Sequence, residues 1–321
     1  MDNENRIKCV STRANVNIAL LKYWGKKEEE LKLPFQTSIA LTLDDLYTDS
    51  TLTRDPALKA DELFLNGKKA SKIEQDKIAH YLDLVRKLYK RKGFIRIESI
   101  NHVPTAAGLA SSASAYASIA LGLNDLFELN LDKKGLSALA RLGSGSASRS
   151  IYGGFSLWVP GDSHETSVAT QIVSDWQDLV FIVVLLSEKQ KAISSREAMK
   201  KSVKLPSYQT FVERSMRMVD PMLKAILEKN LISLGHLMEE SSDLLHATIR
   251  DTGYDFYLPS TYEFLEKLKE IKTDYPLFYT IDAGPNVKLL TTKAYVKDIL
   301  ARLKDYKTLV CHIGGEAHVN S

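Results

Sequence analysis

The sequence predicts an α/β protein in which mixed sheets pack against helices in two halves. Strand and helix patterns alternate through residues 1–187, whereas long amphipathic helices followed by further strands fill the rest of the chain. The chain has 321 residues, 44% of them hydrophobic, which is enough for one large core or two medium ones. No repeat or low-complexity linker separates the halves. We therefore expect two closely packed domains, over residues 1–187 and 188–321.

The elements of the first half follow from local patterns in chain order. Asn66 and Gly67 form a pair that predicts a tight hairpin. Apolar residues recur at helical spacing from Ile78 to Tyr89 and predict a helix that Gly93 closes. The remaining patterns predict strands at residues 94–100, 155–159 and 179–186, and helices at residues 111–126 and 132–142.

The second half begins with helices and ends with strands. Apolar periodicity predicts two or three long helices between residues 207 and 250, and another near residues 261–271. The patterns that follow predict strands at residues 277–281, 287–291 and 308–313, with a helix at residues 293–303.

Composition excludes several classes of protein. The net charge of +3 is too small to predict a nucleic-acid surface, and no run of about 18 apolar residues predicts a membrane span. The amino-terminal residues are polar, unlike a signal peptide. Cys9 and Cys311 have no metal-ligand spacing and fit a reducing environment, so we expect a cytoplasmic protein without nucleic-acid or membrane partners.

One uncharged stretch of small residues, PTAAGLASSAS at 104–114, stands between a predicted strand and a predicted helix. The first turn of a helix has free backbone N–H groups that attract anions, and small residues let a phosphate approach them. Gly108 can adopt a positive φ, and the hydroxyls of Ser111 and Ser112 can reach phosphate oxygens or Mg²⁺. The stretch fits a nucleotide triphosphate site, and the alternative is a tight turn capped by serine. It is not a Walker A loop.

Two further stretches place cations beside small or aromatic residues. GSGSASRSIYGG, at 143–154, sets glycine and serine ahead of Arg149, and the alternative is a flexible loop with a solvated arginine. In ANVNIALLKYWGK, at 14–26, Lys22 and Lys26 flank an aromatic pair. This pattern favours an anionic pocket, and the alternative is a strand end whose lysines extend into solvent.

A fourth stretch, TIDAGPNVK, ends a predicted buried strand with Asp282 and then turns the chain at once. A carboxylate held there is rigid and partly desolvated, which suits a general base or an orienting charge. The alternative is an aspartate that merely forms an Asx-type turn.

Together these stretches resemble the GHMP kinase superfamily and, within it, the diphosphomevalonate decarboxylase family. The resemblance rests on NIALLKYWGK, LPFQTSIALTL, PTAAGLASSAS, SGSASRSIYGG and DAGPNVK, which occur in the family's order. It extends from about residue 13 to residue 287, nearly the whole chain. It implies the two-domain GHMP kinase fold with an ATP and substrate cleft between the halves, and by analogy a homodimer.

The activity that this resemblance implies is decarboxylation of mevalonate 5-diphosphate with ATP and Mg²⁺. The products are isopentenyl diphosphate, CO₂, ADP and phosphate, as in isoprenoid biosynthesis by the mevalonate pathway. The 3-hydroxyl is phosphorylated first, and phosphate then leaves as the carboxylate is lost. Such chemistry needs an acceptor near the hydroxyl, cations for the anionic groups, N–H donors for ATP and exclusion of water.

The resemblance also assigns roles to single residues. Asp282 matches the aspartate proposed as base at the 3-hydroxyl, Arg149 the arginine that holds the carboxylate, and Lys22 the lysine beside them. Asn17 matches an asparagine that orients the arginine. The implied substrate-binding residues are Tyr23, Trp24, Gly25, Lys26, Ser144, Gly145, Ser146, Ala147, Ser148, Arg149 and Arg196. The implied nucleotide-binding residues are Asn101, Pro104, Gly108, Leu109, Ala110, Ser111 and Ser112, with Ser112 also serving the metal.

The sequence departs from the family pattern at two positions. Gln36 stands where the family usually has asparagine, and Ser148 where many relatives have cysteine. Three other functions are alternatives: a decarboxylase of 5-phosphomevalonate, a mevalonate 3-kinase, and a non-catalytic nucleotide-binding relative. The resemblance implies that the 3-kinases lack the lysine and aspartate that are present here as Lys22 and Asp282.

Overall fold

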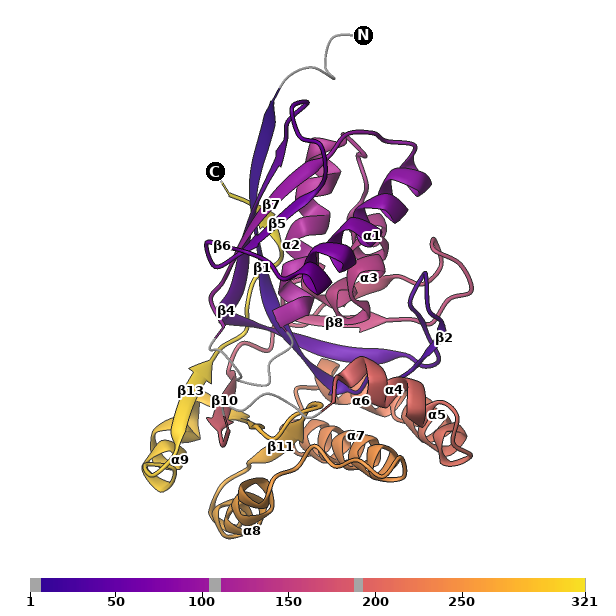
Figure 1. The fold of residues 1–321 in the computed structure, drawn as a ribbon. Helices are drawn as coiled ribbons and strands as arrows, with labels where there is room; N and C mark the ends of the chain where they lie inside the picture. Colours follow the sequence, from indigo (N-terminus) through magenta and orange to yellow (C-terminus); the bar gives the residue numbers. More distant parts are fainter. Residues whose placement is uncertain (1–6, 104–110, 188–192, 321) are drawn as a thin grey trace.

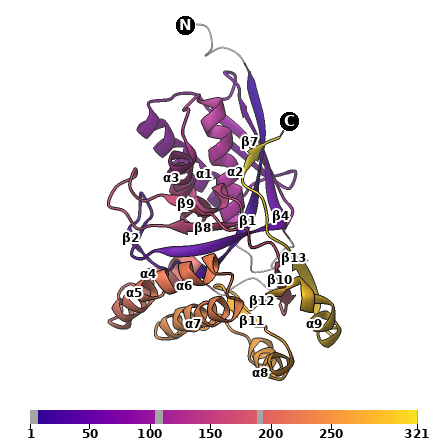
Figure 2. The same ribbon diagram turned by 180° about the vertical axis from the view of Figure 1, so that it is seen from behind.

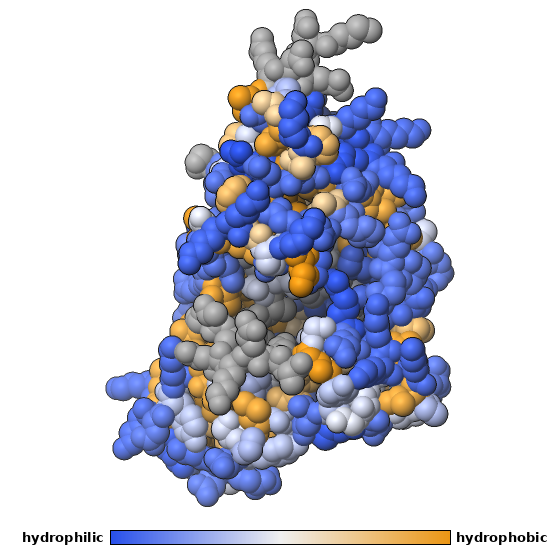
Figure 3. Space-filling model, in the orientation of Figure 1, coloured by the Kyte–Doolittle hydropathy of each residue, from blue (hydrophilic) through white to orange (hydrophobic). Residues whose placement is uncertain are grey.

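The computed structural model describes residues 7–103, 111–187 and 193–320. Figure 1 shows an upper part, made of a large sheet with helices beside it, and a lower part with most of the remaining helices and a smaller sheet. Hydrophilic side chains cover most of the face drawn in Figure 3. None of the described helices combines the length and the apolar character needed to cross a membrane.

The upper part is built on an eight-stranded sheet in the described residues. Its strands follow the order β14-β1-β4-β7-β5-β6, with β8 paired to β4 and β9 to β8. All neighbouring strands pair antiparallel except β5 and β7, which are parallel. The strands are β1 (Lys8–Leu21), β4 (Ser38–Arg54), β5 (Glu62–Leu65), β6 (Lys68–Lys69), β7 (Ile95–Asn101), β8 (Phe155–Trp158), β9 (Ala169–Ile172) and β14 (His318–Val319). A separate pair joins β2 (Lys26–Glu28) to β3 (Leu33–Pro34).

Strand β1 changes character along its length. Its first half alternates between buried and more exposed residues, whereas its last six residues are all buried. This happens because the end of β1 lies between the upper helices and the lower part of the molecule, so both faces are covered (Figure 1). The strand therefore ends inside the protein, and the residue that follows it, Lys22, is placed there too.

Three helices and a 3₁₀ turn cover one face of the large sheet (Figure 1). Helix α2 lies close to β1 and β4 because its contact residues are small or carry hydroxyls: Thr12 Oγ1 donates to the Ser118 carbonyl at 2.8 Å, and Ser50 and Ser118 hydroxyls lie 2.7 Å apart. The elements are α1 (Lys72–Tyr89), α2 (Ser111–Leu126), α3 (Lys133–Gly143) and the 3₁₀ turn η1 (Gly145–Ile151).

The lower part holds a four-stranded antiparallel sheet in the order β11-β12-β10-β13. Helices α8 and α9 cover one face, and α7 packs on the other. The strands are β10 (Leu179–Leu185), β11 (Phe278–Ile281), β12 (Val287–Thr292) and β13 (Lys307–Cys311). The helices are α4 (Ser195–Ser202), α5 (Ser207–Arg217), α6 (Val219–Leu227), α7 (Leu231–Arg250), α8 (Pro259–Asp274), the 3₁₀ turn η2 (Lys293–Tyr295) and α9 (Val296–Arg302).

The two parts share one hydrophobic core. Val16, Ile18 and Leu20 of β1 pack in it with Phe211 of α5 and Leu245 of α7. The chain also crosses back after β13, so that β14 pairs with the edge of β1 in the upper sheet (Figure 2). The predicted boundary between two domains at residue 187 stays a prediction. That prediction assigned all of residues 188–321 to the second domain and did not include the pairing of β14 with the first sheet.

The predicted helices and strands of the described residues are present, with shifted ends. Residues 111–126 are helical as predicted, and residues 207–250 form three helices. The helix predicted at 293–303 is instead divided into the 3₁₀ turn η2, which ends at Tyr295, and α9, which begins at Val296. Helix α4 and the strands β2, β3, β4, β9 and β14 were not predicted from the sequence. Most of these elements are short, but β4 has 17 residues.

Gly235 allows α7 to approach the strand that leads to Asp282, because a Cβ at this position would overlap the ring of Phe278 on β11. We expect Gly235→Ala to destabilise the protein by about 1–3 kcal/mol through overpacking, although alanine is the better helix former. Urea unfolding would measure this, with exposed Ser233→Ala on the same helix as the control. A free energy of unfolding of Gly235→Ala equal to or above that of the wild type would contradict this prediction and show that α7 can move away from Phe278 without destabilising the protein.

Candidate active site

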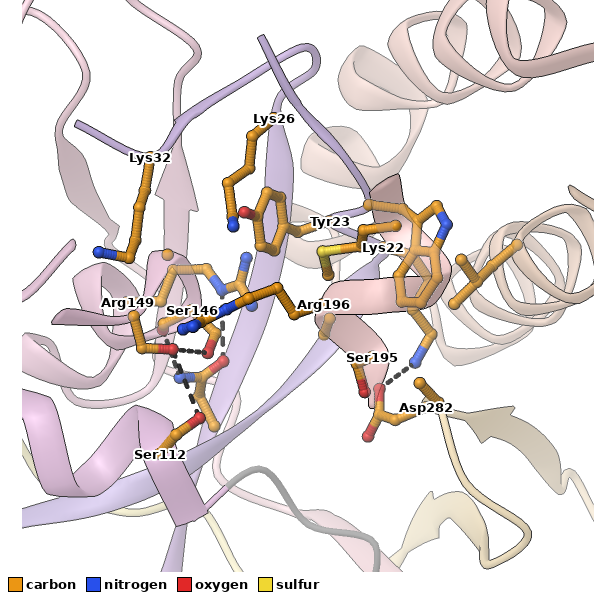
Figure 4. Close-up of a pocket in the computed structure, with 18 residues that line it drawn as sticks. Lys22, Tyr23, Lys26, Lys32, Ser112, Ser146, Arg149, Ser195, Arg196 and Asp282 are labelled. Atoms are coloured by element: carbon orange, nitrogen blue, oxygen red, sulfur yellow. Dashed lines mark hydrogen bonds and ion pairs between the residues drawn. The ribbon is translucent and has the colours of Figure 1, made fainter. Parts of the chain in front are cut away.

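A pocket is lined by several segments: the end of β1 and the residues after it, the turn between β2 and β3, the start of α2, η1, α4, α7 and the turn after β11 (Figure 4). Five cationic side chains and a single carboxylate line it, within the described residues. The cations are Lys22, Lys26, Lys32, Arg149 and Arg196, and the carboxylate is Asp282. The pocket is therefore suited to an anionic ligand.

Lys22 and Asp282 form an ion pair that joins the upper and lower parts. Lys22 Nζ lies 2.7 Å from Asp282 Oδ1, and the lysine side chain is only 2% exposed. The Asp282 carboxylate is 26% exposed, so it reaches the pocket (Figure 4). Burial lowers the pKa of Lys22, and the charge of Asp282 opposes this effect. The Asp282 side chain is thus partly exposed in the pocket, whereas the side chain of its partner Lys22 is almost completely buried.

A second lysine holds the other oxygen of the same carboxylate. Lys288 Nζ lies 3.1 Å from Asp282 Oδ2, and the Lys288 residue is fully buried. Burial by itself would raise the pKa of Asp282, but the charges and hydrogen bonds of Lys22 and Lys288 outweigh it and keep that pKa well below its usual range. Asp282 is therefore ionised at neutral pH.

Arg149 is held on η1 by neutral partners. Its Nε donates to Asn17 Oδ1 at 3.2 Å, and its Nη1 donates to the hydroxyl of Ser38. Asn17 in turn donates to the Ser146 carbonyl at 3.0 Å and to Ser150 Oγ at 2.8 Å. Burial lowers the pKa of Arg149 to about 10, which leaves it charged at neutral pH. Since these partners are neutral, the positive charge of Arg149 remains available to an anion.

The other end of the pocket carries three more cations near Tyr23 (Figure 4). Lys26 Nζ lies 3.0 Å from the exposed Glu29, whereas no carboxylate lies within ion-pair distance of Lys32 or Arg196 in the described part of the chain. Burial lowers the pKa of Lys32 to about 8, and the nearby charges of Lys26 and Arg196 act in the same direction. This end therefore has uncompensated positive charge.

The turn between Lys22 and Lys26 depends on glycine. Gly25 has φ +84°, and a Cβ there would overlap Tyr208. Tyr208 Oη donates to the Trp24 carbonyl at 2.7 Å and fixes the turn against α5. The tight turn directs the two lysines to opposite ends of one pocket.

Hydroxyl groups line the side of the pocket near α2. Ser112 Oγ lies 3.4 Å from Ser144 Oγ, which is 3.4 Å from Ser146 Oγ. A second pocket lies beside this one and is lined by Asn101, Ser111 and Ser112, among others. The start of α2 thus separates two adjoining pockets.

Most of the predicted site residues meet in the first pocket. Those that line it are Asn17, Lys22, Tyr23, Trp24, Lys26, Ser112, Ser144, Gly145, Ser146, Arg149, Arg196 and Asp282. Gly25, Ala147 and Ser148 do not line it: Ala147 packs in the upper core, and Ser148 Oγ donates to the Gly145 carbonyl at 2.8 Å. Pro104, Gly108, Leu109 and Ala110 lie outside the described residues.

Gln36, which stands where the family usually has asparagine, supports the backbone beside the pocket. It is fully buried, and its Nε2 donates to the Trp24 carbonyl at 3.1 Å and the Lys22 carbonyl at 3.4 Å. The amide therefore supports the backbone that carries Lys22, and the side chain does not line the pocket.

Sequence reasoning missed several residues of the site. Lys32 and Ser195 line the pocket, Ser38 contacts Arg149, and Lys288 contacts Asp282. Two signals were available, since Lys32 precedes LPFQTS and Lys288 ends DAGPNVK, both stretches that carry the family resemblance. Ser38 lies inside one of these stretches, LPFQTSIALTL, whereas Ser195 carries no such signal, because serine is common in turns and strands.

The fold and the pocket together define an enzyme of the GHMP kinase class, with a serine-bearing helix start beside an anion-binding cleft. Residues 14–169 match the family model for the diphosphomevalonate decarboxylase-like N-terminal domain, and residues 180–315 match that for the mevalonate 5-diphosphate decarboxylase C-terminal domain. The chain belongs to the diphosphomevalonate decarboxylase family.

Known proteins resemble the chain along nearly its whole length. Diphosphomevalonate decarboxylase of Danio rerio is 33% identical over 325 residues, covering 94% of this chain and 80% of the relative. The crystal structure of mevalonate diphosphate decarboxylase from Staphylococcus aureus is 38% identical with a TM-score of 0.94, covering 98% of this chain and 99% of that one. The structure of MDDEF in complex with MVAPP, AMPPCP and magnesium is 35% identical with a TM-score of 0.94, covering 98% and 100%.

Lys32 gives the pocket a predicted pH dependence. Its pKa of about 8 means that it is charged below that pH and neutral above it, so its attraction for an anion is present below pH 8 and is lost as the pH rises through 8. We expect the affinity for inorganic pyrophosphate, measured by calorimetry, to fall more steeply above pH 8 in the wild type than in Lys32→Met. Pyrophosphate itself also titrates in this range, but its titration affects both proteins equally and therefore does not contribute to the difference between them. Parallel pH profiles would contradict a role for the charge of Lys32 in binding the anion.

Proposed function

We propose that this protein catalyses the ATP-dependent decarboxylation of mevalonate 5-diphosphate to isopentenyl diphosphate, CO₂, ADP and phosphate. The observation that carries the proposal is the arrangement of charge in the pocket, where, among the residues that the structure describes, one lining carboxylate, Asp282, faces five lining cations. The substrate has a matching pattern, because it carries a carboxylate and a diphosphate as well as the hydroxyl to be phosphorylated. Family membership supports the same reaction.

The substrate's orientation follows from the two ends of the pocket. The 3-hydroxyl lies at Asp282 beside Lys22, and the substrate carboxylate pairs with Arg149, which has no carboxylate partner in the described residues. The diphosphate lies at the other end, where Lys26, Arg196 and the hydroxyl of Tyr23 supply charge-assisted contacts. Ser144 and Ser146 line the wall between the two ends and add hydroxyl donors.

ATP approaches from the start of α2. The free N–H groups and positive dipole end of this helix favour phosphate, and the second pocket, lined by Asn101, Ser111 and Ser112, has room for the rest of the nucleotide. Mg²⁺ prefers oxygen ligands and is usually held by few protein groups together with phosphates, and the hydroxyl of Ser112 fits that pattern. When bound, the metal neutralises charge on the phosphates.

The first chemical step transfers the γ-phosphoryl group to the 3-hydroxyl. Asp282 accepts the hydrogen bond of this hydroxyl and orients its oxygen toward the phosphorus, while the buried Lys22 holds the carboxylate still. A carboxylate with a lowered pKa is a weak base. Because phosphoryl transfer passes through a loose transition state, the hydroxyl proton can pass to the Asp282 carboxylate late in the transfer, when the hydroxyl has become more acidic.

The second step breaks two bonds of the phosphorylated intermediate. The C–O bond to the phosphate breaks and gives its electrons to the leaving group, while the electrons of the bond to the carboxylate form the new C=C bond as CO₂ departs. A cation bound tightly to the carboxylate opposes this loss of charge, so Arg149 acts mainly by positioning the group. The enclosed surroundings of Lys22 and Arg149 keep water from the reacting centre.

We also propose a homodimer that acts in the cytoplasm. The dimer is proposed by analogy with the family. The cytoplasmic location is supported by two free cysteines, of which Cys9 is exposed and Cys311 buried.

A substrate panel tests the reaction directly. Mevalonate, its 5-phosphate and its 5-diphosphate would each be incubated with ATP and Mg²⁺, and ADP and CO₂ measured. We expect equal amounts of ADP and CO₂ from the 5-diphosphate alone, because the shorter substrates lose contacts with Lys26 and Arg196. ADP without CO₂ from mevalonate would identify a 3-kinase, turnover of the 5-phosphate would identify the shorter substrate, and ATP binding without products would identify a non-catalytic relative.

The two charged groups at the reacting centre should respond differently to substitution. We expect Asp282→Asn to lower kcat by roughly 10²-fold or more with little change in substrate binding, whereas Arg149→Gln should impair both. The double variant should lose less than the sum of the single losses, because both groups act on one centre. Steady-state kinetics of the four proteins would show this. Normal turnover in Asp282→Asn would remove the proposed base, and strictly additive losses would show independent action.

Ser112→Ala tests the nucleotide site. We expect weaker binding of ATP with Mg²⁺ and slower turnover at an unchanged unfolding temperature, because the hydroxyl is largely exposed at the helix start and can reach phosphate or metal. Ser233→Ala, an exposed serine near the start of α7, is the matched control. Wild-type kinetics in Ser112→Ala would leave this serine without a role in ATP binding.

A further inference from the structure

Lys288 is a buried cation for which the reaction described above has no use. It stands on β12 opposite Thr280 of β11 and Val183 of β10, in the middle of the four-stranded sheet. The residue has no exposed surface and does not line the pocket. A lysine is rarely placed in such a position unless a specific charge partner needs it there.

That partner is the Asp282 carboxylate, which receives one lysine on each oxygen. Lys22 Nζ lies 2.7 Å from Oδ1 and Lys288 Nζ lies 3.1 Å from Oδ2. A single cation would neutralise the carboxylate, so the second buried ammonium group adds positive charge that must be desolvated at a cost.

The sheet explains how Lys288 reaches Asp282. After β11 the chain makes a tight turn, in which the Gly284 N–H donates to the Asp282 carbonyl at 2.6 Å, and then returns as β12. Side chains alternate along β12, so Lys288 shares a face with Leu290, which packs in the core between the two parts. Lys288 thus reaches Asp282 from β12 of the lower part, whereas Lys22 reaches it from the end of β1 in the upper part.

We propose that Lys288 is a positioning residue for the decarboxylation: it grips Oδ2 of Asp282, so that the carboxylate stays charged and its exposed edge faces the substrate hydroxyl. This inference rests on the proposed function. Without Lys288 the carboxylate would be free to rotate toward Lys22 and form a two-oxygen contact that turns it out of the pocket. Lys288 acts through Asp282, since its own side chain does not line the pocket.

The charged and titratable groups around Asp282 come from several elements. Lys22 follows β1, Lys288 lies on β12, and the charge of Arg149 on η1 also acts on Asp282. His246 of α7 donates from Nε2 to the Ile281 carbonyl at 3.2 Å, and its pKa is lowered by burial to about 3, so it is neutral. Among the described residues, removal of Lys288 therefore leaves Lys22 and Arg149 as the cations that act on the carboxylate.

The test compares Lys288→Met, which removes the charge but keeps the length, with Lys288→Gln, which keeps a hydrogen-bond donor. Lys297→Met, an exposed lysine of α9, is the control, and thermal unfolding shows which variants fold. The first readout is the carboxyl ¹³C signal of Asp282 in aspartate-labelled protein without substrate, assigned with Asp282→Asn. We expect its titration midpoint to rise by roughly one pH unit or more in both Lys288 variants and to stay unchanged in Lys297→Met. An unchanged midpoint would overturn the proposal.

The second readout is kinetic. We expect Lys288→Met to lower kcat by about 10-fold to 100-fold with KM for ATP unchanged, to move the acid limb of the kcat profile upward, and to be partly rescued in Lys288→Gln. In an Asp282→Asn background Lys288→Met should cost little more, and a full additive loss there would overturn the proposal. If the wild type released no CO₂, the proposed function would fail, while the ¹³C titration would still decide whether Lys288 controls Asp282.

Discussion

The ion pair between Lys22 and Asp282 constrains the rest of the structure, because it joins residues 260 positions apart and is closed off from water on the lysine side. A buried ammonium group without a partner is strongly destabilising, so the ends of β1 and β11 must be held in register. Helix α7 does this with two adjacent serines: Ser241 Oγ accepts the Lys22 N–H at 2.9 Å, and Ser242 Oγ accepts the Ile281 N–H at 2.9 Å. One helix therefore sets the distance between the two strands that carry the pair.

Positive charge beyond this pair gives the protein its second constraint. Arg149 and Lys32 occupy a common pocket without carboxylate partners in the described residues, and the charges of Lys26 and Arg196 repel that of Lys32 while no ligand is present. The surrounding core resists this repulsion by holding each cation with neutral partners, such as Asn17 and the Leu142 carbonyl. An anionic ligand relieves the repulsion without requiring new side-chain positions, which favours binding through preorganisation. The electrostatic repulsion among the cations of the pocket is therefore present in the protein without ligand and is removed when an anionic ligand binds.

Local patterns predicted most of this molecule, and tertiary contacts account for what they missed. The helix over Ser111–Leu126 and the placement of Lys22, Arg149 and Asp282 in one pocket agree with the sequence analysis. Lys288 ends DAGPNVK, but the stretch does not tell that its side chain reaches back to Asp282, because that contact depends on the fold of the turn between them. The return of β14 to β1 was equally hidden, since a two-residue strand has no periodicity to read. Both features depend on which strands become neighbours, and no single stretch of sequence contains that information.

The pairing of β14 with β1 has a consequence for synthesis of the chain. Thr12 leaves the ribosome long before its partner Val319, and at about 5–20 residues per second the roughly 300 residues between them take about 15–60 s. During that time one edge of β1 lacks its final neighbour, and open strand edges invite pairing with other nascent chains. Lys8, Ser11 and Arg13 stand on this part of β1, where charged and hydroxyl side chains discourage such contacts. The polar first half of β1 therefore also protects the growing polypeptide until the last strand arrives.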